Sequence, residues 1–141
     1  MRVMLDTNIL VSAIFFPSKQ TRTLVAEITR HHHLILCDYV LEELRLVVNR
    51  KFQAKKPALE KFFSSLRFEL IDTHEDYDYG DIPSVRDHKD TPILAAAIKN
   101  DADVFITGDK DFLVLNIDRP QIMNSTQKSG TPMLGNPAYT H

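Results

Sequence analysis

The stretch Val3-Met4-Leu5-Asp6-Thr7-Asn8-Ile9-Leu10 decides the fold class of this chain. Three apolar residues lead to an aspartate, and residues 9–16 then continue with helical character until Pro17 and Ser18 end the run. The pattern predicts a strand, a turn and a helix, with a carboxylate at the carboxyl end of the strand. Ligands of α/β proteins bind in the cleft outside the carboxyl ends of the strands. Asp6 is therefore the first candidate site residue.

Strand-like and helix-like apolar segments alternate along the rest of the chain. Strands are expected at residues 34–37, 68–71, 102–107 and 121–123, and helices at 21–30, 39–50, 57–66 and 91–98. This alternation predicts an α/β fold with a parallel sheet and right-handed crossovers. Asp38 is the expected N-cap of the helix over 39–50. The segment 72–87 is typical of a polar, acidic loop.

A length of 141 residues, 43% of them apolar, suits one domain with one core. Residues 1–123 are expected to form this domain. Residues 124–141 are rich in Ser, Thr, Pro, Gly and Asn, and are expected to form a polar, partly disordered tail. No run approaches the roughly 18 to 20 apolar residues of a membrane span, and the first residues lack the pattern of a secretory signal. A soluble cytoplasmic protein is expected.

The cysteine and histidine content offers two further features. The single cysteine, Cys37, lies in an apolar run and is expected to be a buried, inert thiol in a reducing compartment. Three adjacent histidines, residues 31–33, fall where a helix gives way to a strand. Adjacent residues do not share a helix face, so a solvated junction is favoured over a metal-binding tract.

Four short acidic segments each follow or open a predicted apolar element: Asp6-Thr7-Asn8, Glu43-Leu44, Asp90-Thr91-Pro92-Ile93 and Thr107-Gly108-Asp109-Lys110-Asp111. Carboxylates that converge from several elements repel one another, and this is costly unless a cation lies among them. Oxygen ligands favour Mg²⁺ or Mn²⁺ over zinc. A metal-dependent enzyme is therefore expected. Taken singly, each acid fits a helix cap, a turn or an exposed helix position equally well.

The helix expected over 39–50 carries two adjacent glutamates that face different ways. Its apolar residues recur at helical spacing and define one stripe. At about 100° per residue, Glu43 lies roughly 100° from the centre of that stripe and Glu42 roughly 160° from it. Glu43 is thus placed at the edge of the buried face, and Glu42 points to water.

The formal net charge of −2 is unevenly distributed. Residues 1–66 hold 10 Lys/Arg and 6 Asp/Glu, a net +4, whereas residues 67–141 hold 7 and 13, a net −6. The basic excess lies in a stretch that also contains Phe52, Phe62 and Phe63: Arg45, Arg50, Lys51, Lys55, Lys56 and Lys61. Such a patch fits a phosphate backbone, but it equally fits a solvated helix face with core aromatics.

Four motifs together resemble those of PIN-domain nucleases, in order and spacing, over roughly residues 2–123: Leu5-Asp6-Thr7-Asn8-Ile9-Leu10, Glu43-Leu44, Asp90-Thr91-Pro92-Ile93-Leu94-Ala95-Ala96-Ala97 and Ile106-Thr107-Gly108-Asp109-Lys110-Asp111-Phe112. Within that family the chain is most similar to VapC-like ribonucleases, the toxins of toxin-antitoxin modules. The resemblance implies a single PIN-like domain with a five-stranded parallel sheet flanked by helices. The chain departs from the family pattern at its C-terminal end. Residues from 124 onward are polar, whereas such toxins usually have an apolar strand and a short helix there.

The resemblance also implies roles for individual residues. Asp6, Glu43, Asp90 and Asp109 would be the catalytic acids, with Asp6, Asp90 and Asp109 as ligands of Mg²⁺ or Mn²⁺. Asp111 would be an accessory acid, and Asn8 and Thr107 supporting polar groups. Apart from the resemblance, the basic patch described above makes Arg45, Arg50, Lys51 and Lys55 candidates for RNA contacts.

The expected function is a metal-dependent endoribonuclease that hydrolyses RNA phosphodiester bonds and acts as the toxin of a toxin-antitoxin module. Its expected partners are the RNA substrate, a cognate antitoxin protein and a second copy of the chain. The alternative is a PIN-like module that binds RNA or protein without turnover. An intact acid set argues against that alternative, because a module that only binds would gain from losing the like-charge repulsion.

Overall fold

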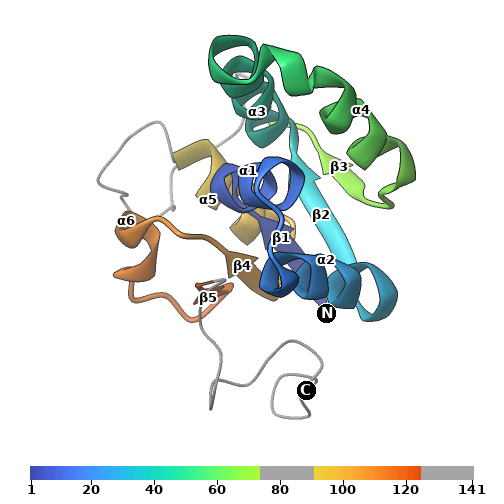
Figure 1. Ribbon diagram of the computed structural model, residues 1–141. Helices are drawn as coiled ribbons and strands as arrows, with labels where there is room; N and C mark the ends of the chain where they lie inside the picture. The colour runs from blue at the N-terminus through green and yellow to red at the C-terminus, as the bar shows by residue number, and fades with distance from the viewer. Residues whose placement is uncertain (74–90, 125–141) are drawn as a thin grey trace.

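The computed structural model describes residues 1–73 and 91–124 (Figure 1). Asp90, nearly all of the acidic loop and nearly all of the polar tail expected from the sequence lie outside these ranges. Five strands form one parallel sheet in the order β3-β2-β1-β4-β5: β1 (Arg2–Leu5), β2 (His33–Cys37), β3 (Glu69–Ile71), β4 (Val104–Ile106) and β5 (Gln121–Met123). The expected α/β fold with a five-stranded parallel sheet is confirmed.

The helices connect these strands: α1 (Thr7–Phe15), α2 (Lys19–His31), α3 (Asp38–Lys51), the 3-10 turn η1 (Gln53–Lys55), α4 (Lys56–Ser65), α5 (Thr91–Lys99) and α6 (Lys110–Leu113). Given this strand order, the usual right-handed crossover predicts α1 to α4 on one face of the sheet and α5 and α6 on the other. Figure 1 shows α1 and α2 in front of the strands and α5 behind α1. The short elements η1 and α6 are not predicted from the sequence, because three or four residues are too few to show a helical period.

The strand order creates one switch point in the sheet. From β1 the chain continues to β2 on one side, whereas β4 lies on the other side of β1 and leads on to β5. The connections that leave the carboxyl ends of β1 and β4 therefore diverge, which opens a crevice between them. Asp6 directly follows β1, and Thr107 directly follows β4. The backbone N–H of Asp6 donates to the Ile106 carbonyl over 3.0 Å, so the two strand ends are held together.

The core is built from strands that are buried on both faces. Three consecutive residues of β1, four of β2 and all three of β4 are buried. Helix α5 is buried over five consecutive residues, Ile93 to Ala97. Small alanines in this run allow the helix to lie close to its neighbours. The result is a rigid support beneath the carboxyl edge of the sheet.

The start of α3 differs from the sequence-based expectation. Asp38 is the first helical residue, and Cys37 occupies the N-cap position without a side-chain hydrogen bond. The Asp38 carboxylate instead accepts hydrogen bonds from the backbone N–H of Tyr39 (2.8 Å) and of Thr73 (2.9 Å), and from the Thr73 hydroxyl. Asp38 therefore ties the residues after β3 to the start of α3, a long-range contact that local cap preference does not predict.

The turn between α5 and β4 is closed by a Schellman motif. The Asp101 backbone has a positive φ of 56°, the Ala102 N–H donates to the Ala97 carbonyl (2.9 Å), and the Asp101 N–H donates to the Ile98 carbonyl (3.3 Å). A non-glycine residue in this left-handed region is uncommon, although aspartate is among the residues that tolerate it. This sharp turn directs the chain into β4 and so sets the position of Thr107.

Cys37 and the histidines lie where the sequence placed them. Cys37 is fully buried, and burial raises the pKa of its thiol to about 12. His31 ends α2, His32 is its C-cap and His33 begins β2, so the run is a helix-to-strand junction. None of the helices in the described ranges is long and apolar enough to cross a membrane.

Candidate active site

Asp6 is the centre of the candidate site. It is only 5% exposed, and as the N-cap of α1 its Oδ1 accepts a hydrogen bond from the backbone N–H of Thr7 over 2.7 Å. Its other oxygen, Oδ2, accepts a hydrogen bond from the Thr107 hydroxyl, also over 2.7 Å. One carboxylate oxygen is thus held by each side of the crevice. The helix-cap interpretation of Asp6 is therefore correct, and it coexists with a buried carboxylate at the switch point of the sheet.

Thr107 connects Asp6 to the next acid along the edge. Its side chain is fully buried, and its Oγ1 both donates to Asp6 and accepts from the backbone N–H of Asp109 over 3.0 Å. Asp109 in turn caps α6, because its Oδ1 accepts from the Asp111 N–H over 2.9 Å. A chain of hydrogen bonds therefore orients the two candidate acids, Asp6 and Asp109, relative to each other.

The electrostatic environment of Asp6 is unfavourable for its charge. Burial is the largest cause that raises its pKa, and the hydrogen bonds from Thr107 and Thr7 only partly oppose it. The negative charges of Glu43 and Asp109 raise the pKa of Asp6 further. Glu43 is half-buried on α3 whereas Glu42 is exposed, as predicted from the helical stripe. Two of the other three predicted acids, Glu43 and Asp109, are thus near enough for their charges to act on Asp6.

Thr7 is a further candidate site residue that is absent from the predicted set. Its side chain is 4% exposed, and its Oγ1 is buried without a hydrogen-bond partner among the residues that the structure describes. Burying a hydroxyl without a partner costs free energy, so such a group usually has a partner that the structure does not contain. The available sequence signal is the hydroxyl directly after Asp6, at the first position of the helix.

The other predicted site residues differ in their positions. Asn8 is exposed on α1, and the Asp6 carboxylate accepts hydrogen bonds from Thr7 and Thr107. Asp111 is half-buried in α6, next to Asp109. Asp90 lies outside the described ranges, although α5 begins at the next residue and its first turn is therefore close to Asp90 in the chain.

The donor chemistry of the site fits a hard divalent cation. Its side chains supply carboxylate and hydroxyl oxygens, which Mg²⁺ and Mn²⁺ prefer. Burial is the main cause of the raised pKa of Asp6, and a cation would also offset the smaller repulsion from Glu43 and Asp109. However, residues 1–73 and 91–124 contain no group of three or more His, Cys, Asp or Glu side chains arranged to hold a metal ion. The described acids alone therefore do not make a complete set of ligands.

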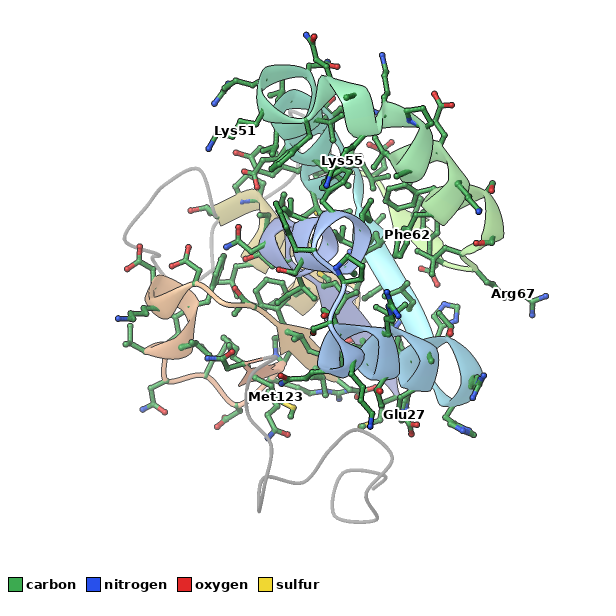
Figure 2. All side chains as sticks on the ribbon, in the orientation of Figure 1. Glu27, Lys51, Lys55, Phe62, Arg67 and Met123 are labelled. Carbon is green, nitrogen blue, oxygen red and sulfur yellow. The ribbon has the colours of Figure 1, made fainter. Side chains whose placement is uncertain are left out.

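The four candidate RNA contacts are all exposed but do not share one surface. Arg50 and Lys51 lie in the last turn of α3, and Lys55 lies in η1. Figure 2 shows Lys51 and Lys55 at the same end of the molecule. Arg45 is two residues beyond Glu43, hence roughly 200° around the helix, and it lines the groove between α3 and α4. Although Arg45 is close to Glu43 in the sequence, the two side chains therefore lie on different sides of α3.

Two cavities in the described structure lie away from the acids. One of about 440 Å³ lies between α3 and α4, and one of about 620 Å³ lies between α1, α2 and α4. Neither is lined by Asp6, Glu43 or Asp109. The chemistry of the carboxyl edge and the switch-point topology identify the candidate site more directly than cavity size does.

Residues 2–111 match the sequence pattern of the family described as PIN domain. The chain belongs to the PIN domain family. PIN domains are nuclease domains, so membership supports a hydrolase that acts on nucleic acids. Among curated proteins, no sequence matches this chain significantly.

Two solved structures have a closely similar fold. One is a chain from the crystal structure of VapBC2 from Rickettsia felis, solved with a DNA fragment from the VapBC2 promoter. It matches with a TM-score of 0.72 and 24% sequence identity, over 88% of this chain and 98% of that chain. A chain from DNA-bound VapBC from Salmonella typhimurium matches with a TM-score of 0.69 and 20% identity, over 89% and 98%. At these identities the matches establish the PIN-like fold.

Proposed function

We propose that the protein is a metal-dependent endoribonuclease that hydrolyses RNA phosphodiester bonds. The observation that carries the proposal is a buried aspartate, Asp6, whose pKa is raised at the switch point of a PIN-domain sheet by burial and by the charges of Glu43 and Asp109. A buried carboxylate whose charge is disfavoured in this way is typical of functional sites, because a fold selected only for stability would lose it.

The roles of the residues follow from their positions. Asp6 and Asp109, together with Asp90, would hold Mg²⁺ or Mn²⁺, and Thr107 positions the first two through its hydrogen bonds. Glu43 would orient the attacking water or complete the ligand set. The bound metal would make that water more acidic and would offset the charge of the phosphodiester. Thr7 Oγ1, buried beside Asp6, is available to donate a hydrogen bond to a water in the site.

The test compares matched variants of adjacent glutamates. Purified protein is incubated with structured and single-stranded RNAs in Mn²⁺ or Mg²⁺, with EDTA as a control. Glu43→Gln, Asp6→Asn and Asp90→Asn should each lower cleavage at least about 100-fold, the upper end of losses seen when a partner of a metal ligand is removed. Glu42→Gln changes the same charge on the exposed side of α3 and should retain activity.

Cleavage that survives EDTA, or that is lost equally in Glu42→Gln and Glu43→Gln, would contradict the assignment. The alternative of an RNA- or protein-binding module without turnover has one observation in its favour. Asp6 and Asp109 both serve as helix caps, so their presence alone does not require a metal. That module would show no cleavage and no binding of Mn²⁺ in the millimolar range.

We further propose that the protein is the toxin of a toxin-antitoxin module and acts in the cytoplasm. Support comes from the two similar structures, which are VapBC complexes. A small antitoxin would occlude the acidic crevice, and a basic side chain among the carboxylates would be the matching chemistry. A homodimer is the proposed resting form. Failure of the neighbouring gene's product to bind the protein and block cleavage would refute the antitoxin proposal, and sedimentation as a monomer would refute the dimer.

A further inference from the structure

Helices α1 and α3 lead from the candidate site to a second feature of the surface. Both helices start at the carboxyl edge of the sheet, after Asp6 and after β2. Both end together, because the rings of Phe15 and Phe52 stack with centroids 5.1 Å apart. At 1.5 Å per residue, the nine residues of α1 place its C-cap, Phe16, roughly 15 Å from Asp6.

Phe16 is an exposed aromatic ring held in a fixed position. It is 58% exposed, although Phe52 packs against it edge to face with centroids 5.6 Å apart. Lys55 Nζ lies 5.3 Å from the centre of the Phe16 ring and donates to the Phe15 carbonyl over 3.4 Å. The lysine therefore closes the end of α1 and makes a cation–π contact at the same time. Much of the ring surface remains open to solvent.

The surroundings of this ring are strongly basic. Residues 44–59 contain five Lys/Arg and no Asp or Glu, a local net charge of +5. Lys51 and Lys56 are exposed on either side of Lys55 in the sequence, and Figure 2 shows Lys55 pointing toward the end of α1. An exposed ring within a cationic surface favours an anionic partner that also has flat apolar faces.

The last turn of α3 carries two cations between this ring and the acids. Arg50 follows Glu43 by seven residues, so the two side chains lie on the same face of α3, roughly 20° apart around the helix and roughly 10 Å apart along it. Lys51 lies next to Arg50 in the same turn. Two cations at the end of α3, Arg50 and Lys51, therefore lie between Glu43 and the Phe16 end of the molecule, where they could contact a phosphate backbone.

We propose that Phe16, Lys55 and Lys51 form an accessory site for single-stranded RNA, in which an unpaired base stacks on Phe16 and the flanking phosphates contact the two lysines. The inference rests on the proposed nuclease function for its choice of RNA. Single strands are favoured over duplexes because paired bases hide their faces within the stack. The site lies a few nucleotides along the strand from the bond that is cut.

The experiment measures binding without cleavage. Full-length protein carrying Asp6→Asn is titrated into a fluorescent single-stranded RNA of mixed sequence, and into the same RNA as a duplex, with anisotropy as the readout. Adding Phe16→Leu should weaken single-strand binding about five- to 100-fold, the range for losing one stacked base. Phe16→Trp should bind at least as tightly as the parent. Lys55→Gln should weaken binding and lower the salt-dependence slope by about 0.7.

The matched control is Arg67→Gln, which removes one exposed positive charge beyond the far end of α4, where Figure 2 labels Arg67. It should leave single-strand binding within twofold of the parent. Urea unfolding of each variant separates loss of binding from loss of fold. The proposal is overturned if folded Phe16→Leu binds within twofold of the parent, if Phe16→Trp is as weak as Phe16→Leu, or if the parent binds no single-stranded RNA.

The two proposals fail in different ways. If Phe16→Leu loses single-strand binding while the wild-type protein cuts no RNA in Mn²⁺, the accessory site stands and the nuclease proposal fails. If the wild-type protein cuts RNA and Phe16→Leu binds and cuts equally well, the nuclease proposal stands and the accessory site fails.

Discussion

Replacing Thr107 by valine removes one buried hydroxyl while leaving the volume of the side chain almost unchanged. Thr107 is fully buried, and its Oγ1 donates to Asp6 Oδ2 over 2.7 Å and accepts from the Asp109 N–H over 3.0 Å. The valine variant therefore leaves a buried carboxylate oxygen without a donor. It also leaves one backbone N–H without its acceptor.

The expected loss follows from these two contacts. A hydrogen bond to a charged group contributes about 1.5 to 3 kcal/mol, and the partly buried N–H of Asp109 adds about 1 kcal/mol at most. The free energy of unfolding of Thr107→Val should therefore fall by about 2 to 4 kcal/mol at neutral pH. Thr107→Ser retains the hydroxyl and should recover most of this loss.

The loss should depend on pH in a defined direction. Burial raises the pKa of Asp6, and the Thr107 hydrogen bond opposes that rise, so the valine variant raises the pKa further. A carboxyl whose pKa is higher in the folded state disfavours folding once the pH exceeds its unfolded value, near 3.8. The extra cost of the variant is therefore largest at neutral pH. It shrinks as the pH falls and Asp6 becomes protonated in both states.

Urea unfolding followed by circular dichroism at pH 7 and pH 4 tests both parts of this prediction. Cleavage of RNA in Mn²⁺ by the same variants should fall about 10- to 100-fold for valine, as for other groups that orient metal ligands. If the free energies of unfolding of Thr107→Val and Thr107→Ser differ by less than about 0.5 kcal/mol at pH 7, the reasoning is refuted, because that difference is well below the contribution of one hydrogen bond to a charged group. An equal loss at both pH values would refute the link to the Asp6 charge.

Two further predictions concern residues away from the acids. Burial raises the pKa of Cys37 to about 12, so its thiol should not react with a disulfide reagent at pH 8 until urea unfolds the protein; rapid reaction of the folded protein would contradict its burial. Hydrogen bonds from Arg2 and His33 lower the pKa of Glu69 in the folded protein. The cluster therefore stabilises the fold at pH values above the unfolded pKa of glutamate, and this stabilisation is lost as the pH falls through the lower folded pKa. Because the group is solvent-exposed, Glu69→Gln should cost less than about 1 kcal/mol at neutral pH, and a loss above 2 kcal/mol in urea unfolding would contradict this.

Local patterns in the sequence were sufficient for the elements and for the direction of several side chains. All five strands of the sheet were predicted: β1, β2 and β4 from apolar runs that are buried, the edge strand β3 from its alternation, and the edge strand β5 from a short apolar segment. Helical periodicity alone separated half-buried Glu43 from exposed Glu42. The placement of Asp6 after β1 likewise needs only the apolar run before it and the helix after it.

Other features depend on contacts between distant parts of the chain. The hydrogen bond between Asp6 and Thr107 joins residues 101 positions apart, and it exists because β1 and β4 are neighbours in the sheet. The N-cap of α3 is Cys37, and the Asp38 carboxylate binds Thr73 as well as the Tyr39 N–H, because β2 and β3 end side by side. Neither pairing leaves a local signal, since strand order is decided by how the crossovers pack on the sheet.

The sequence by itself therefore determined the elements, the α/β class and the identity of the candidate acids, because these depend on local burial and residue chemistry. Only the tertiary structure decided that the charges of Glu43 and Asp109 act on Asp6, and that Thr107 bonds to both Asp6 and Asp109. It alone brought Phe16 beneath Lys55, residues that lie 39 positions apart, because α1 and α3 end at the same place. The physical reason is that contacts between distant segments leave no periodic pattern in the sequence, whereas local burial does.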